Sequence, residues 1–284
     1  MQSLTDIKAL LAGRGIRPKH RFGQNFLHDH NQLKKLVHAA NVQPGELVLE
    51  VGPGTGTLTE TLLEAGANVI ACEIDPDMQA IVRERTAAYA PDRFRLVAGD
   101  CLDGKRSLSA ELVTALDRRP FVLVANLPYG AASPLMAVLA SRYPECRGQF
   151  VTVQKEVGDR IRAEPGTRDY GPLTVIMQLF ATIREIAVVK PGSFWPAPDV
   201  TSAMIAIEPT SKRPFATDAE LDAFESFLHT VFSKRRKQLG AILGRDVPWP
   251  RGIEPEMRPE VLGVDQLLGL ARVVASGHRS HGTT

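Results

Sequence analysis

The sequence predicts an α/β fold: a Rossmann-like, doubly wound sheet of seven strands whose last strand is antiparallel, followed by a small all-α domain. First, short apolar runs alternate with helical patterns from residue 47 onward, which is typical of parallel strands joined by helices. Second, a glycine-rich turn at 52–56 directly follows the first run. Third, the last two runs are separated by a loop, 191–198, which is too irregular for a helical crossover and therefore favours an antiparallel ending.

Each predicted strand is a short apolar run bounded by turn-forming or acidic residues. In chain order the strands are 47–51, 68–72, 94–98, 121–127, 149–153, 183–189 and 202–207. The helices of this part are predicted at 4–11, 29–40, 57–65, 76–89, 108–116, 134–142, 155–163 and 173–180. Ser133 is expected to cap the helix that begins at Pro134, since Pro is favoured at a first helical position.

A polar linker at 208–214 divides the chain into two predicted domains, 1–209 and 210–284. Beyond the linker the patterns are helical, at 219–232, 234–243 and 264–276. The last eight residues are expected to be disordered.

Composition excludes several classes of protein. The 284 residues are 44% hydrophobic and 23% charged, which is typical of a globular chain, and the net charge of +2 is too small to indicate nucleic-acid binding by itself. Three Cys and seven His show no metal-ligand spacing, so no metal site is predicted. The sequence has no apolar stretch of membrane-spanning length and no signal-peptide core, so a cytoplasmic protein is expected.

The fourth strand delivers an unusual set of residues, Asn126-Leu-Pro-Tyr129, to the edge of the sheet. Ligands of open α/β sheets bind outside the carboxyl ends of the strands, where these residues are expected to lie. The amide oxygen of Asn126 is a neutral acceptor, and Tyr129 offers a ring on which a base can stack. Together they indicate a planar substrate that carries an amino group.

A glycine-rich motif, Glu50-Val-Gly-Pro-Gly-Thr-Gly56, joins the first strand to a helix and resembles a dinucleotide-binding turn. Acidic residues end the next two strands at Glu73 and Asp100, and an acid about 20 residues beyond the glycines can accept from ribose hydroxyls. The acid that precedes the glycines, Glu50, suits a ligand without phosphate. S-adenosylmethionine, which is cationic, is such a ligand.

The chain resembles the ribosomal small-subunit adenine dimethyltransferases, from residue 17 to about 245. The resemblance rests on motifs that occur in order: Phe22-Gly-Gln-Asn-Phe-Leu27, Glu50-Val-Gly-Pro-Gly-Thr-Gly56, Glu73-Ile-Asp75, Gly99-Asp100, Asn126-Leu-Pro-Tyr129 with Ser133, Gln154-Lys-Glu-Val157, Phe194-Trp-Pro-Ala-Pro198 with Val200 and Ser202, and Phe232-Ser-Lys-Arg-Arg-Lys237.

The resemblance implies an S-adenosylmethionine-dependent transferase of ribosome biogenesis and rRNA processing. Such an enzyme converts two adjacent adenosines near the 3′ end of 16S rRNA to dimethyladenosine. It acts on the rRNA within a pre-assembled small subunit, late in assembly. A monomer is expected. The family's cofactor contacts correspond to Asn25, Leu27, Gly52, Gly54, Glu73, Asp100 and Asn126. Its adenine-holding, catalytic residues correspond to Asn126, Leu127, Pro128, Tyr129 and Phe194.

These residues suit methylation of an adenine amine, which is a poor nucleophile because its lone pair is delocalised into the ring. Asn126 and the backbone carbonyl of Leu127 can accept its two hydrogens and favour a pyramidal nitrogen, so orientation and polarity replace a strong base. Stacking on Tyr129 and Phe194 offsets the cost of unstacking the target base. Trp195 is a rival to Phe194 for this role.

With an RNA substrate, exposed basic residues are expected to contact phosphates. The predicted RNA-binding residues are Arg21, beside the cofactor motif, and a run placed at the start of a helix: Lys234, Arg235, Arg236 and Lys237.

Two positions depart from the family pattern: Gly130 stands where Asn is usual, and Asp199 where a basic residue is common. Three other functions stay open from the residues: a large-subunit (23S) rRNA adenine methyltransferase of the macrolide-resistance type, a ribosome-assembly factor acting mainly by binding, and a nicotinamide dehydrogenase. The dehydrogenase is discouraged because no residue suits hydride transfer.

Overall fold

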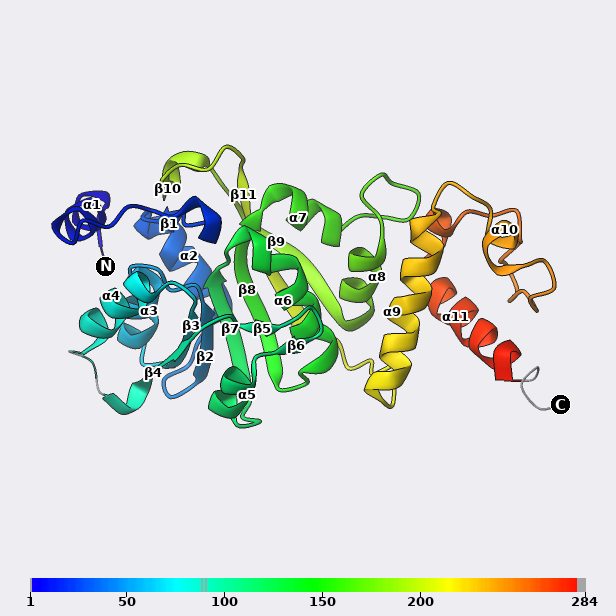
Figure 1. The fold of residues 1–284 in the computed structure, drawn as a ribbon, viewed down its shortest axis with the longest axis horizontal. Helices are drawn as coiled ribbons and strands as arrows, with labels where there is room; N and C mark the ends of the chain where they lie inside the picture. The colour runs from blue at the N-terminus through cyan, green and yellow to red at the C-terminus, as the bar shows by residue number, and fades with distance from the viewer. Residues whose placement is uncertain (1, 88, 90, 280–284) are drawn as a thin grey trace. The chain divides into compact units, whose positions relative to one another are not determined.

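The computed structural model describes residues 2–87, 89 and 91–279, and it forms two compact units (Figure 1). The first unit comprises Met1–Gly158 and Thr182–Pro209, and the second comprises Asp159–Ala181 and Thr210–Thr284. The division into a methyltransferase domain, 1–209, and a helical domain, 210–284, stays a prediction; in the structure the segment Asp159–Ala181 groups with the second unit. The predicted disordered tail is helical at 277–279, and its remainder, 280–284, lies outside the described residues.

The first unit is built on a sheet of seven strands in the order β4-β3-β2-β7-β8-β11-β9 (Figure 1). Its strands are β2 (Leu47–Val51), β3 (Asn68–Glu73), β4 (Phe94–Ala98), β7 (Phe121–Asn126), β8 (Cys146–Gln154), β9 (Ala181–Val189) and β11 (Ser202–Pro209). The pairings among β4, β3, β2, β7 and β8 are parallel, whereas β11 runs antiparallel to β8. The predicted fold class, with its antiparallel last strand, is therefore confirmed.

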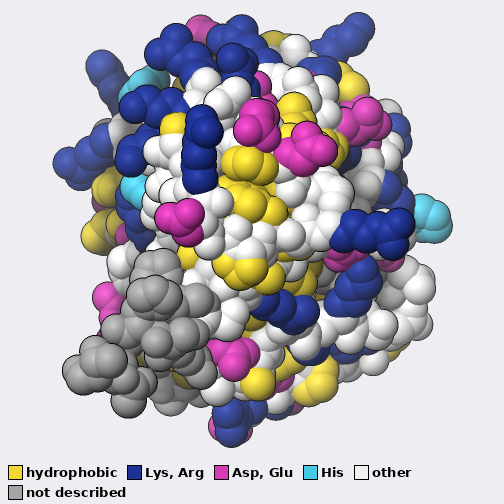
Figure 2. Space-filling model, turned by 90° about the vertical axis from the view of Figure 1, so that its right-hand side faces the viewer, with side chains coloured by type: hydrophobic (Ala, Val, Ile, Leu, Met, Phe, Trp, Pro, Cys, Tyr) yellow, Lys and Arg dark blue, Asp and Glu magenta, His cyan; other side chains and the backbone are white. Residues whose placement is uncertain are grey.

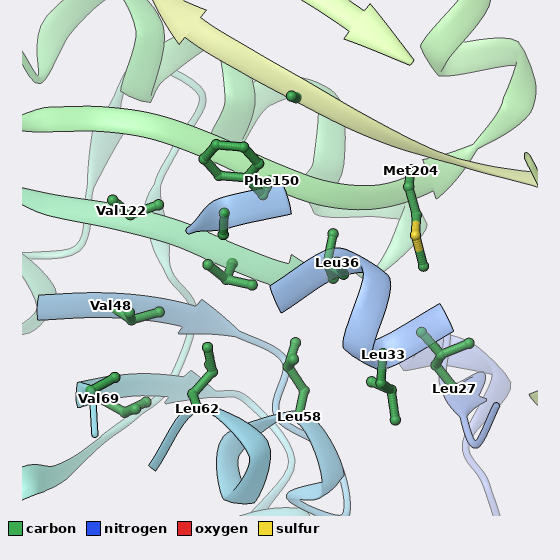
Figure 3. Close-up of a cluster of buried hydrophobic side chains, with 14 of the residues drawn as sticks. Leu27, Leu33, Leu36, Val48, Leu58, Leu62, Val69, Val122, Phe150 and Met204 are labelled. Atoms are coloured by element: carbon green, nitrogen blue, oxygen red, sulfur yellow. The ribbon is translucent and has the colours of Figure 1, made fainter. Parts of the chain in front are cut away.

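Apolar side chains on one face of this sheet pack against helices α2 (His30–Ala40) and α3 (Thr57–Glu64). Figure 3 shows Val48, Val122 and Phe150 of three neighbouring strands facing side chains of these two helices. Since all five residues of β2 are buried, the second face of the sheet is covered as well. This explains the continuous apolar runs by which the strands were predicted.

The helices occupy most of the segments predicted for them. Besides α2 and α3 they are α1 (Leu4–Gly13), α4 (Pro76–Thr86), α5 (Ala110–Leu116), α6 (Tyr129–Arg142), α7 (Lys155–Ile161), α8 (Pro172–Phe180), α9 (Asp218–Ser233), α10 (Leu239–Leu243) and α11 (Val264–Arg279). Short 3-10 turns lie at His20–Phe22, Pro91–Arg93, Pro191–Ser193 and Pro259–Val261. Among the described residues, no helix is both long and apolar enough to cross a membrane.

Two small sheets were not predicted. Strand β1 (Phe26–Leu27) pairs with β10 (Phe194–Trp195), and β5 (Leu102–Asp103) pairs with β6 (Ser107–Leu108). The residues that pair in the first of these sheets are far apart in the chain. Two-residue strands carry no periodicity, so only the folded chain brings such partners together.

The helix after β7 begins earlier than predicted. It starts at Tyr129, with Pro128 before it, and Pro134 lies inside it. Ser133 is therefore not its N-cap. Only the first four N–H groups of a helix lack a partner within the helix, so Pro134, the sixth residue, costs a single backbone hydrogen bond. The helix begins three residues after the end of β7, and this early start places Tyr129 in the first helical turn at the edge of the sheet.

The second unit contains α8 to α11 and is held by aromatic contacts. Tyr170 is buried, donates its hydroxyl to the Leu262 carbonyl at 2.9 Å and packs on Phe232 with the ring centroids 6.0 Å apart. Phe215 packs between Phe180 and Phe224. The helix predicted at 234–243 is wrong in its first half, because the structure has turns at 234–236 and helix only at Leu239–Leu243.

Candidate active site

A cavity of about 1080 Å³ lies in the first unit, at the carboxyl ends of β2, β3 and β7. It brings together most of the side chains that the sequence singled out. The predicted cofactor and catalytic residues that line it are Asn25, Leu27, Gly52, Gly54, Glu73, Asp100, Asn126, Pro128 and Tyr129. The folded chain thus gathers five separate motifs around one space, as expected for the carboxyl edge of an open α/β sheet.

The turn between β2 and α3 has a backbone that requires glycine. Gly52 and Gly54 have φ values of +73° and +55°, which disfavour residues with a Cβ atom. Space is short as well: a Cβ on Gly52 would lie 3.0 Å from Pro128 Cγ, and one on Gly54 would lie 2.9 Å from Phe26 Cε1. The glycines therefore let neighbouring segments close over the turn.

Glu73 is placed at the end of β3 with its carboxylate held by backbone N–H groups. Its Oε1 accepts from Asp75 N at 2.9 Å, and its Oε2 is 3.3 Å from Gly54 N, which donates to it. Burial raises the pKa of this carboxyl, against the lowering effect of these hydrogen bonds. Asp100 is exposed at the end of β4 and accepts from Leu102 N at 3.0 Å. Both acids face the same cavity.

Glu50 is a fully buried acid on the cavity wall. It is 1% exposed and accepts from Thr59 Oγ1 at 2.7 Å. Burial raises its pKa from 4.5 to about 8, and the nearby charge of Glu73 adds to the rise, against the Thr59 hydrogen bond. Among the described residues, none forms an ion pair with Glu50, so the site lacks a cation of its own at this point.

These features fit S-adenosylmethionine. The buried Glu50 lacks a cationic partner, which suits a positively charged ligand. The glycine turn carries no Lys or Arg between 50 and 58, whereas a phosphate-bearing ligand would favour a cation there. Glu73 and Asp100 supply acceptors for hydroxyl and amino groups on the same cavity.

Asn126 is oriented by the chain segment that precedes β1. Its Nδ2 donates to the backbone carbonyl of Asn25 at 2.9 Å. A carbonyl can pair only with the NH₂ side of the amide, so this contact fixes which way the amide points. In the part of the chain that the structure describes, no group donates to Asn126 Oδ1, which remains able to accept from an amine at the cavity.

Tyr129 lies on the cavity wall with its hydroxyl 3.4 Å from Ser202 Oγ, a fully buried side chain of β11. This contact holds the phenol at one end and leaves the ring half-buried, as stacking on a base requires. Leu127 has a buried side chain and donates its N–H to the Thr152 carbonyl at 3.1 Å. Its predicted role uses the backbone carbonyl.

The structure does not bring Phe194 to the cavity. Its side chain is 3% exposed, packs in the core cluster with Leu27 and Leu33, and belongs to β10. Its rival Trp195 stacks on Phe26 and is also not part of the cavity wall. Burying a phenyl ring in a core is strongly favourable, and the β1–β10 pairing turns Phe194 inward. The cavity instead meets the following residues, 196–200.

The predicted RNA-binding residues fall into two groups. Arg21 is exposed at the cavity, with its guanidinium 4.7 Å from the centroid of the Phe22 ring. Lys234, Arg236 and Lys237 are exposed on the second unit. Figure 2 shows Lys and Arg side chains gathered toward the top of one face of the molecule, with acidic side chains among them.

Arg235 has a structural position that sequence reasoning missed. Its Nε donates to Glu260 Oε2 at 2.7 Å, and its other nitrogens donate to the carbonyls of Arg168 at 2.8 Å and Thr167 at 3.3 Å. All of these residues belong to the second unit. Arg235 is therefore occupied in holding this unit together, and it differs in this from its exposed neighbours in the basic run.

This difference gives a paired prediction. Arg235→Ala leaves Glu260 and two carbonyls without their donor, so we expect the free energy of unfolding to fall by about 2–3 kcal/mol. Arg236→Ala removes an exposed side chain and should change stability by less than about 0.5 kcal/mol, while lowering RNA affinity and the salt dependence of binding. Urea unfolding and RNA titrations at two salt concentrations measure both effects. Equal stability of the two variants would contradict the structural position of Arg235.

Several further contacts around the cavity had no signal in the sequence. Gln2 donates from Nε2 to the Thr55 carbonyl at 2.8 Å, and Lys105 lines the cavity from the turn between β5 and β6. Lys19 and Gln24 contact Asp75 beside the site. Single polar residues in loops have no periodic pattern, so their partners became visible only in the folded chain.

Comparison with known families agrees with this geometry. The sequence model of the family described as Ribosomal RNA adenine dimethylase matches residues 15–272. The chain belongs to this family. The match covers most of both units and all the cavity residues named above. The cofactor that the cavity residues suit is also the cofactor of this family, because ribosomal RNA adenine dimethylases depend on S-adenosylmethionine.

Relatives of this adenine dimethylase are similar along nearly the whole chain. A Ribosomal RNA small subunit methyltransferase A of Bifidobacterium adolescentis is 37% identical over 284 residues, which covers 95% of this chain and 92% of the relative. A protein of the same name from Mycolicibacterium gilvum is 39% identical over 238 residues, covering 82% of this chain and 73% of the relative.

Solved structures resemble the fold of this adenine dimethylase. A dimethyladenosine transferase from Plasmodium falciparum has a TM-score of 0.67 and 26% identity, covering 86% of this chain and 95% of its own. A 23S rRNA methyltransferase has a TM-score of 0.64 and 24% identity, covering 88% of this chain and 100% of its own. The second likeness concerns the fold alone.

The buried acid of this adenine dimethylase gives a pH prediction. Between pH 4.5 and about 8 the folded Glu50 carboxyl holds a proton that the unfolded chain releases. The free energy of unfolding should therefore fall as pH rises through this range, by up to about 1.4 kcal/mol per pH unit. Glu50→Gln should flatten this dependence. Urea unfolding of both proteins without cofactor at pH 5.5, 6.5 and 7.5 tests it, and parallel pH profiles would contradict the assignment.

Proposed function

We propose that this adenine dimethylase transfers methyl groups from S-adenosylmethionine to the 6-amino groups of two adjacent adenosines near the 3′ end of 16S rRNA. The product is dimethyladenosine, and the substrate is small-subunit rRNA within a pre-assembled subunit, late in assembly. The observation that carries the proposal is the fixed amide of Asn126, which presents an acceptor to an amine at a cavity lined by Glu50, Glu73 and Asp100.

The choice of small-subunit rRNA as the substrate is supported by similar proteins, and the proposal extends to the oligomeric state and the place of action. The relatives from Bifidobacterium adolescentis and Mycolicibacterium gilvum, which resemble the chain over most of its length, are named for the small subunit. The cavity is formed by residues of the first unit, and action as a monomer is part of the proposal. Cytoplasmic action is part of the same proposal, since the substrate is a ribosomal subunit.

The residues of the chain perform three tasks in this proposal. Bound S-adenosylmethionine supplies an electrophilic methyl group. Glu50 and Glu73, which line the cavity, complement the charge and the hydroxyl groups of the bound ligand. Asn126 Oδ1 accepts from one hydrogen of the adenine amine. The backbone carbonyl of Leu127, the next residue, accepts from the other, although Leu127 is not among the residues that line the cavity. These two hydrogen bonds favour a pyramidal nitrogen, whose lone pair is less delocalised into the ring. The nitrogen is therefore more nucleophilic, and no strong base is needed.

Tyr129 and Pro128 form the wall against which the base is expected to lie. Stacking on an aromatic ring contributes roughly 1–3 kcal/mol per base, which offsets the few kcal/mol needed to unstack the target. Phe194 is buried away from the cavity, and of the two aromatic residues predicted to stack on the base only Tyr129 lines it, which supports Tyr129 in that role.

The decisive test supplies the protein with unmethylated small subunits, unmethylated large subunits and labelled S-adenosylmethionine. We expect label in 16S rRNA, located by primer extension, and dimethyladenosine in mass spectra of the digested RNA. Label confined to 23S rRNA would identify the large-subunit alternative. Subunit binding without label in either RNA would identify a factor that acts by binding.

A further inference from the structure

A segment that ends with β1 closes one side of the cavity. We call residues 18–27 the strap. Nine of its ten residues line the cavity, and its last two form β1, which pairs with β10. The first part of the strap has no strand or long helix to hold it, since it contains only the short turn His20–Phe22. Its position must therefore come from side-chain contacts.

The contacts that hold the strap converge on Asp75, whose side chain is fully buried. Lys19 Nζ lies 2.6 Å from Asp75 Oδ1, and Gln24 Nε2 donates to Asp75 Oδ2 at 2.7 Å. Lys19 Nζ also lies 2.7 Å from Asp77 Oδ2. The backbone N–H of Lys19 donates to Gln24 Oε1 at 2.7 Å, which closes a ring of hydrogen bonds.

This ring is stronger than an ordinary surface ion pair. Burial raises the pKa of Asp75, but the hydrogen bonds from Lys19 and Gln24 outweigh it, and the net shift is downward. The carboxylate is therefore ionised at neutral pH. Removing one hydrogen-bond donor from an ionised, buried carboxylate costs free energy, so the contacts of Lys19 and Gln24 hold the strap at Asp75.

The same strap touches the residues proposed to hold the adenine. The carbonyl of Asn25, next to Gln24 in the chain, accepts from Asn126 Nδ2 at 2.9 Å. Gly23 lies against the start of α6, where an added Cβ would be 3.5 Å from Tyr129 N. The hydrogen-bond ring at Asp75 and the amide of Asn126 are thus connected through two residues of one short segment.

We propose that Lys19 and Gln24 are positioning residues for methyl transfer, which hold the strap on Asp75 so that the Asn25 carbonyl keeps the Asn126 amide oxygen available to the adenine amine. The inference rests on the proposed function, because it assigns these residues to the same site. If the strap leaves, the Asn126 amide loses the acceptor that fixes its orientation and can turn its NH₂ group to the substrate. A donor there repels the amine that an acceptor would bind.

The test compares Lys19→Met and Gln24→Ala with wild type, using unmethylated small subunits and saturating S-adenosylmethionine. We expect each variant to lower kcat by about 10-fold or more, with KM for the subunit within about 2-fold, since a misplaced group affects the chemical step. Gln24→Ala leaves the charge unchanged, so it separates positioning from phosphate contact. Lys19→Arg, which keeps the charge, should recover most of the activity. Lys35→Met is the matched control, because it removes an exposed Lys of α2 outside the cavity.

A second measurement does not depend on methylation. Arg21 is exposed within the strap, so the rate of tryptic cleavage after Arg21 reports strap opening. Cleavage should be several-fold faster in Lys19→Met and Gln24→Ala than in wild type or Lys35→Met. Circular dichroism and Tm of each variant show whether the fold is retained.

The outcomes separate the inference from the function. If wild type methylates 16S rRNA while both variants keep wild-type kcat, the inference is overturned and the function stands. A rise in KM alone for Lys19→Met, with Gln24→Ala unaffected, would also overturn it in favour of direct RNA contact. If wild type methylates no small-subunit RNA, the proposed function fails, and the cleavage rates still decide whether Lys19 and Gln24 hold the strap.

Discussion

Replacing Asn126 with Ala is expected to lower kcat for adenine methylation by about 10²–10³-fold, the range typical of losing one preorganised polar group at a reacting centre. The substitution removes the oxygen proposed to accept from the amine, and it leaves the Asn25 carbonyl without the amide N–H that it now accepts at 2.9 Å. Single-turnover methylation of small subunits at saturating S-adenosylmethionine measures the loss.

Two further variants show whether the cause is orientation of the amide. Asn126→Asp is isosteric but sets a carboxylate oxygen against the Asn25 carbonyl, so it should be as inactive as Asn126→Ala. Thr152→Val, on the neighbouring strand β8, is the control. Thr152 pairs with Asn126 in the sheet and has a buried hydroxyl without a partner among the described residues, so the valine should preserve activity and stability. Retained activity in Asn126→Ala would remove the central residue of the mechanism.

Gly54→Ala is expected to weaken S-adenosylmethionine binding by about 100-fold or more. Alanine would have to adopt a φ near +55°, which disfavours residues with a Cβ atom. Its Cβ would lie 2.9 Å from Phe26 Cε1, so the turn or the Phe26 ring must move. Because Glu73 accepts from Gly54 N, any shift of the turn also releases an acid of the cavity. Isothermal titration with the cofactor measures the effect directly.

Gly269→Ala is the matched control for this substitution. Gly269 lies in helix α11, without a positive φ and with nothing within 4 Å of an added Cβ. Alanine should there stabilise the protein by up to about 1 kcal/mol and leave cofactor affinity unchanged. Similar affinity of Gly54→Ala and wild type would show that the glycine turn does not approach the ligand.

The strands of the parallel sheet could be predicted from the sequence because they are buried on both faces. The run at 121–125 is apolar at successive positions, and the structure places it in the centre of the sheet within β7. The carboxyl ends of such strands meet at one edge, so the sequence predicts that Glu73, Asp100 and Asn126 lie near one another, and all three line the cavity.

Elements that depend on distant partners could not be predicted. The sequence predicts Phe194 at the substrate. Its strand instead pairs with Phe26–Leu27, which is far away in the sequence, and this pairing directs the Phe194 side chain into the core. The basic run at 234–237 was expected to be helical, whereas Arg235 turns toward Glu260 and the backbone at 167 and 168. In both cases a tertiary contact outweighs the local preference.

The sequence by itself determined the fold class, the glycine turn and the acids and amide at the strand ends, because periodicity and turn chemistry are local properties of the chain. The tertiary structure alone decided which groups are free to act. Folding buries Glu50, which raises its pKa, and pairs Arg235 with Glu260. It also places Phe194 in the core instead of at the cavity, and it connects the strap to Asn126 by a hydrogen bond. These properties depend on desolvation and on hydrogen bonds between residues far apart in sequence, which exist only when the chain is folded.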